Sequence, residues 1–162
     1  MSKAFTSEEA PDLGPVIPPV PRPRPGELHP VTPEGAAELR ARLERLRAER
    51  ARTATEAERA RAGERIAALE ATLAAQAVKE PELGARGEAG FGAWVTVEDE
   101  AGARRTWRLV GPDEADARRG LVSVRAPLGR ALLGRRAGET ATVERPDGPA
   151  ELEVTDVRRT AP

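Results

Sequence analysis

The apolar residues of this chain change their spacing near residue 90, and this change constrains the fold more than any other feature. Before it, apolar residues recur at alternating steps of three and four, a pattern typical of helices that pack on one another. After it, apolar and polar residues alternate, which is typical of half-buried strands. The sequence therefore predicts an α+β protein, with an N-terminal antiparallel α-helical hairpin and a C-terminal antiparallel β domain that contains one short helix.

Residues 31–78 carry the helical pattern and predict a short coiled coil. Thr32 suits an N-cap, and Pro33 suits the first helical position. Two apolar seams follow, made of Ala36, Leu39, Leu43 and Leu46 and of Ala62, Ile66, Leu69 and Leu73. Two helices of one chain that pack seam to seam explain this pattern. A single long helix that dimerises through both seams stays open, because neither Gly nor Pro lies between Arg50 and Ala62.

Residues 79–90 contain Pro and Gly and predict a linker, and residues 91–162 predict the β domain. Strands are expected at 93–98, 105–110 and 121–124, followed by a helix at 128–133 and a closing hairpin of 140–144 with 150–155. The expected architecture is a twisted antiparallel sheet that wraps around the short helix.

Residues 1–30 predict a disordered, Pro-rich tail, because six prolines between positions 15 and 25 favour extended backbone and few apolar residues accompany them. The run PVPRPRP also has the spacing of a docking peptide, although a plain tail is the preferred interpretation. His29, the only histidine, is expected to be solvated in this tail rather than to bind a metal.

Composition excludes several classes of function. The net charge of −1 argues against a nucleic-acid binder that relies on overall positive charge, so no sequence-specific nucleic-acid contact is expected. The absence of Cys excludes disulfides and thiolate metal sites, and no metal or other cofactor is expected. No apolar run is long enough to cross a membrane, and the N-terminus lacks the apolar core of a signal peptide, so the protein is expected to be soluble and cytoplasmic.

Five runs occur in the order found in one family: VTPEGAAELRARLERL, FGAWVTVEDEAG, RLVGPDEAD, SVRAPLGRALLG and AGETATVERPDGPAELEVTDV. On these runs the chain resembles the GreA/GreB transcription factors from Val31 to its end, and FGAWVTVED leans toward GreB. The resemblance implies an FKBP-like C-terminal domain. It also implies that bacterial RNA polymerase is the partner, bound at the rim of its secondary channel.

The resemblance also implies where docking takes place. The residues implied to dock lie in RLVGPDEAD and in the loop before the short helix: Asp113, Glu114, Ser123, Arg125, Pro127 and Leu128. Ser123 and Pro127 match the family pattern. Arg125 stands where GreB-like proteins tend to carry an acidic residue, and such an inversion costs several kcal/mol unless the partner surface has changed too.

The hairpin tip departs from the family. Members that stimulate transcript cleavage carry an Asp and a Glu there, which help to hold a second Mg²⁺ at the polymerase active site. This tip consists of Arg52, Thr53, Thr55, Glu56 and Glu58, and no Asp occurs between Asp12 and Asp99. Arginines surround both glutamates, so a salt-bridged surface is the preferred interpretation. Each arm is also shorter than in the family by roughly ten residues, or about 15 Å of helix.

The sequence therefore predicts a monomeric regulator of transcription elongation that binds RNA polymerase and has no catalytic residue of its own. Two alternatives stay open: a cleavage factor that uses Glu56 or Glu58, and an adaptor whose coiled coil dimerises. Prolyl isomerase activity, suggested by the FKBP-like resemblance, would need an aromatic pocket. Only Trp94 and Trp107 could build one, and core packing is expected for both.

Overall fold

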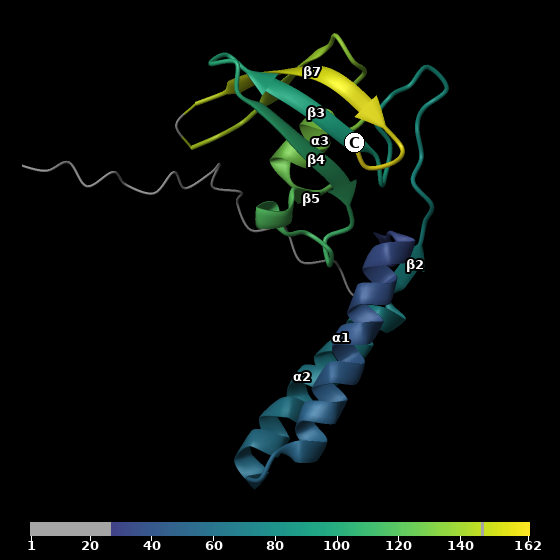
Figure 1. The fold of residues 1–162 in the computed structure, drawn as a ribbon, viewed down its shortest axis with the longest axis vertical. Coiled ribbons are helices and arrows are strands. Elements are labelled where there is room, and N and C mark those ends of the chain that lie inside the picture. The colour runs from purple at the N-terminus through teal and green to yellow at the C-terminus, as the bar shows by residue number, and fades with distance from the viewer. Residues whose placement is uncertain (1–26, 147) are drawn as a thin grey trace, which may run out of the picture.

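A computed structural model describes residues 27–146 and 148–162 of the chain (Figure 1). Residues 1–26 of the predicted tail, including the PVPRPRP run, and Asp147 of the predicted closing turn lie outside the described residues. The fold is α+β, as predicted, with a helical hairpin that projects away from a β domain. No helix within the described ranges is both long and apolar enough to cross a membrane.

The hairpin consists of α1 (Pro33–Arg52) and α2 (Glu56–Ala74), which pack against each other. Thr32 is the N-cap of α1, and its hydroxyl accepts a hydrogen bond from the Gly35 N–H at 3.0 Å. Leu43, Leu46 and Ile66 are buried between the helices, with Leu69 and Leu73 packed beside them. The predicted two-helix hairpin is confirmed, and the alternative of one unbroken helix is wrong for this structure, since the chain turns back at 53–55.

The prediction that residues 29 and 30 belong to a disordered tail is wrong. These residues belong to β1 (His29–Val31), which pairs in parallel with β2 (Gln76–Val78) just after α2. His29 is buried rather than solvated, because its Nδ1 lies 3.1 Å from Asp113 Oδ2 in the β domain. The chain therefore enters and leaves the hairpin through one small two-stranded sheet.

The β domain is a five-stranded sheet in the order β5-β4-β3-β7-β6. The strands are β3 (Trp94–Asp99), β4 (Arg104–Val110), β5 (Leu121–Ser123), β6 (Thr140–Val143) and β7 (Ala150–Arg158). Three of its pairs are antiparallel, as predicted, but β4 and β5 are parallel. The connection from β4 to β5 contains the 3₁₀ helix η1 (Ala117–Arg119) and brings the chain back beside Arg108, so that β5 runs parallel to the end of β4, which a tight hairpin would not allow.

The short helix α3 (Pro127–Leu132) covers one face of this sheet. Leu128 and Leu132 of α3 pack into the core with buried residues of all five strands, among them Val95, Leu109 and Val154. The core is small and mostly aliphatic, as the low aromatic content requires.

The two tryptophans do not share a pocket. Trp107 is buried in the core and pairs across the strands with Val95, whereas the adjacent residue Trp94 points to the opposite face. There the Arg108 guanidinium lies over the Trp94 ring at 5.5 Å from its centroid. The aromatic-walled pocket that an isomerase would need is absent from these two positions.

Candidate functional site: the base, the docking loop and the tip

The base of the hairpin is fastened to the β domain by the Glu114 carboxylate. It accepts hydrogen bonds from the Thr32 N–H at 3.0 Å and from the Gly111 N–H at 3.1 Å, and a short one from the Thr32 hydroxyl. A negative charge at this place also suits the first turn of a helix, where backbone N–H groups lack partners within the helix. Glu114 was predicted to contact the polymerase, but in this structure its oxygens are occupied within the chain.

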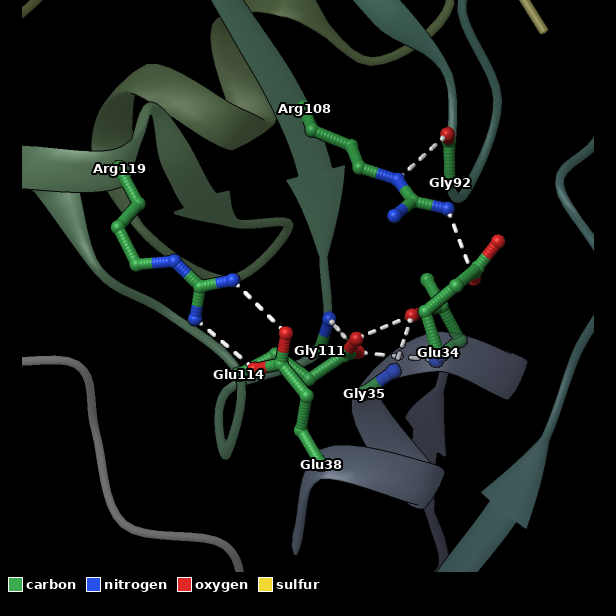
Figure 2. A network of polar contacts seen from close by, with 9 residues as sticks. Glu34, Gly35, Glu38, Gly92, Arg108, Gly111, Glu114 and Arg119 are labelled. Atoms are coloured by element: carbon green, nitrogen blue, oxygen red, sulfur yellow. Dashed lines mark hydrogen bonds and ion pairs between the residues drawn. The ribbon is translucent and has the colours of Figure 1, made fainter. Parts of the chain in front are cut away.

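Two ion pairs add to this junction (Figure 2). Arg108 of β4 reaches Glu34 at 3.0 Å, and Arg119 of η1 holds both oxygens of Glu38 at 2.8 and 2.9 Å. The backbone amide of Glu34 and, beyond it, Arg108 lower the pKa of the Glu34 carboxyl. The hydrogen bond from Arg119 lowers the pKa of Glu38 and raises the pKa of Arg119. Both carboxylates therefore stay charged at neutral pH and hold α1 to the sheet.

The loop between β5 and α3 is the predicted docking loop, and its residues differ in access. Ser123 is buried, and its hydroxyl accepts a hydrogen bond from the Arg125 N–H at 3.1 Å. Leu128 lies in the core, so both residues shape the loop and neither is accessible at its surface. Arg125 and Pro127 are partly exposed, as is Asp113 beside His29. Arg125 donates from Nη2 to Glu27 Oε1 at 2.6 Å.

The tip of the hairpin is a capped turn whose carboxylates have partners. Thr55 is the N-cap of α2, and its hydroxyl donates to Glu58 Oε2 at 2.6 Å while accepting from the Glu58 N–H. Arg59 pairs with Glu56 at 3.0 Å and also donates to the Thr53 carbonyl. Arg52 is exposed in the last turn of α1. Thr55 and Glu58 thus form a capping box, whereas the Thr53 hydroxyl donates to the Glu49 carbonyl.

These contacts occupy carboxylate oxygens at the tip that could otherwise bind a cation. Across the described ranges no group of three or more His, Asp or Glu side chains could hold a metal ion. At the tip, Glu56 and Glu58 lie in the first turn of α2 beside Arg59, so a cation would compete with an arginine and with a hydroxyl donor. The geometry is that of a cap, and it differs from an assembled metal site.

Sequence reasoning missed the junction. Its partners, Glu34 and Glu38 with Arg108 and Arg119, are 74 and 81 residues apart, and no local pattern relates such positions. The run RLVGPDEAD contained Arg108 but not Arg119, and the start of the first helix contained the two glutamates. Only the fold brings the two together.

Comparisons with known proteins find relatives of this chain. Residues 84–159 match the sequence model of the family described as "Transcription elongation factor, GreA/GreB, C-term". Transcription elongation factor GreA of Alkalilimnicola ehrlichii is 43% identical over 96 residues, which make up 58% of this chain and 61% of that protein. Transcription elongation factor GreB of Yersinia pestis is 36% identical over 94 residues, or 58% of this chain and 55% of that protein. The chain thus spans about three fifths of the length of the curated relatives it matches.

Among solved structures, GreA factor homolog 1 (Gfh1) of Thermus thermophilus is 27% identical. The match covers 82% of this chain and 99% of that one, with a TM-score of 0.41.

Proposed function

We propose that this chain, which carries the C-terminal domain of the GreA/GreB family, is a transcription elongation regulator that binds RNA polymerase at the rim of the secondary channel and does not stimulate transcript cleavage. Binding is assigned to the β domain, with Asp113, Arg125 and Pro127 as the accessible residues of the docking surface. The hairpin would enter or cover the mouth of the channel. We place the protein in the bacterial cytoplasm, where its partner is.

The observation that carries the second half of this proposal is the set of contacts at the tip. A cleavage factor contributes chemically by placing carboxylate oxygens so that they hold Mg²⁺ beside the ion already in the polymerase. Glu58 is engaged by the Thr55 hydroxyl and Glu56 by Arg59, and no aspartate lies in the turn. A cation at the tip would therefore have to displace these partners.

The length of the hairpin also argues against stimulation of cleavage. Helix α1 has 20 residues, so the hairpin extends only about 30 Å beyond its base at about 1.5 Å per residue. Metal-assisted chemistry needs ligands placed to within a fraction of an ångström. A hairpin that ends about 15 Å short of the family's tip cannot place them.

The second candidate is an authentic cleavage factor, and one observation favours it. The Glu56 side chain is 85% exposed, so its pairing with Arg59 is a surface ion pair that contributes little stability and can be exchanged. If Arg59 moved aside, Glu56 could face a cation.

A backtracked elongation complex separates the two candidates. With cognate polymerase and Mg²⁺, the protein should leave release of short 3′ RNA fragments at the intrinsic rate, and it should slow cleavage by an added active GreA because both compete for one entry. Release above the intrinsic rate, lost in Glu56→Ala or Glu58→Ala but kept in the shaft control Glu64→Ala, would establish the cleavage factor instead. Failure to compete would argue against binding at the channel.

A further inference from the structure

A short segment before α1 joins the docking loop to the base of the hairpin. This segment, residues 27–32, will be called the strap. It contacts the docking loop through Glu27, the loop after β4 through His29, strand β2 through β1, and Glu114 through Thr32. The strap lies outside residues 84–159, which the model of the C-terminal domain matches.

We propose that the strap is part of the polymerase-docking surface, with Glu27 as the residue that presents a carboxylate to a basic patch of the polymerase; this inference rests on the proposed function. Arg125 acts beneath Glu27 as a positioning residue. The docking surface is then built from two segments of the chain, because Glu27 and Arg125 are 98 residues apart.

The geometry of the Glu27–Arg125 pair determines which of its two charges faces outward. The Glu27 side chain is 46% exposed, whereas that of Arg125 is 25% exposed. Arg125 reaches only Oε1 of Glu27, and Oε2 accepts no other hydrogen bond within the described part of the chain. A carboxylate with one oxygen held and the other open is already oriented, so a partner cation binds it at a lower cost in side-chain entropy.

The surroundings of Glu27 fit a basic partner with an apolar contact. Asp113 adds a second, partly exposed carboxylate to the same segment, because it pairs with His29 two residues further along the strap. Between them, Leu28 is 63% exposed, more than Val78 or Leu133. A large apolar side chain flanked by acidic groups is suited to a protein surface that carries Lys or Arg around an apolar depression.

The strap is also held firmly enough to act as a recognition element. Val31 is fully buried, and the Pro30 carbonyl lies directly over Gly111, where even a Cβ would overlap it. The pairing of β1 with β2 fixes the backbone direction just after Leu28. A segment fixed along most of its length loses little freedom when it binds.

The test measures binding of the full chain to purified core RNA polymerase from the same organism, in low and moderate salt. Glu27→Gln should bind about tenfold more weakly than wild type, through loss of one charge-assisted contact, and its affinity should respond less to salt. Glu100→Gln, on the exposed turn between β3 and β4, is the matched control and should bind like wild type.

A charge swap distinguishes presentation from mere attachment. The double variant Glu27→Arg with Arg125→Glu keeps an internal ion pair but presents a cation, so it should stay at least tenfold weaker than wild type. Recovery of wild-type affinity in the swap, or unchanged binding of Glu27→Gln, would overturn the inference while leaving the proposed function intact. If neither the wild type nor any of the variants binds the polymerase, the proposed function itself is wrong.

Discussion

Two glycines at the junction show how closely the strap and the hairpin approach the β domain. A Cβ on Gly111 would overlap the Pro30 carbonyl, and a Cβ on Gly35 would overlap the Glu114 carboxylate. Neither glycine has a positive φ, so the requirement is for space alone. These positions let a backbone N–H and a helix N-terminus share one carboxylate, which holds the hairpin in place.

At the residue scale, Gly111→Ala should destabilise the protein by about 1–3 kcal/mol, because backbone atoms on both sides must move apart. Gly63→Ala is the matched control, since its Cβ would meet only the Arg50 side chain at 3.7 Å in the middle of α2. It should stabilise the protein by about 0.5–1 kcal/mol through higher helix propensity. Urea unfolding measures both changes in the free energy of unfolding. If Gly111→Ala is no less stable than Gly63→Ala, the close approach of the strap to Gly111 is contradicted.

At the element scale, the hairpin is stabilised by a narrow seam. Only Leu43, Leu46 and Ile66 are buried in it, with Leu69 and Leu73 at its side, and the remaining faces carry charged residues. Surface pairs such as Arg47 with Glu44 and Glu70 contribute little each. The hairpin is therefore held by a few apolar contacts and by its attachment at the base.

Leu43→Asp should cost several kcal/mol of hairpin stability, because it places an unpaired charge in that seam. Ala41→Asp, at an exposed position of the same helix, should change helicity far less. Circular dichroism during thermal unfolding compares the two variants. Sedimentation of wild type at micromolar concentration should show a monomer, and a stable dimer dissociated by Leu43→Asp would favour packing between chains.

At the scale of the whole molecule, two ion pairs join the base of the hairpin to the β domain. The pKa values of Glu34 and Glu38 are lowered on folding, so both carboxyls bind protons less readily in the folded state than in the unfolded one. Their stabilising effect is fully present above the ordinary glutamate pKa of about 4.3, and it is lost as pH falls through the lowered folded values. Acid should therefore loosen the junction.

The double variant Glu34→Gln with Glu38→Gln should show a smaller loss of stability than wild type between pH 7 and pH 3. The pH dependence of stability should become smaller but should not disappear, because the hydrogen bond from Arg136 also lowers the pKa of Glu139. Thr142→Ala, at an exposed and uncharged position of β6, should keep the wild-type dependence. Urea midpoints across this range provide the measurement. A double variant with the full wild-type dependence would show that these two pairs do not couple pH to folding.

The sequence by itself determined the two helices of the hairpin and most elements of the β domain, because each depends on neighbours in the chain, but it did not predict β1 and β2. The spacing of Leu39, Leu43 and Leu46 defined one helix, Thr32 and Pro33 defined its start, and alternation after residue 93 defined the strands. The capped turn with Thr55 followed from residues three positions apart. Local periodicity and capping are short-range physics, which a single chain displays directly.

Only the tertiary structure decided how these elements meet. His29 seemed solvated among prolines, yet Asp113, 84 residues away, gives it a buried partner. The parallel pairing of β4 with β5, the occupation of Glu114 by the first helix and the contact of Glu27 with Arg125 all join distant segments. Such contacts depend on the direction in which each element leaves the others. Residue spacing does not encode that direction, whereas packing of the small core and burial of Val31 and Thr32 in the strap fix it.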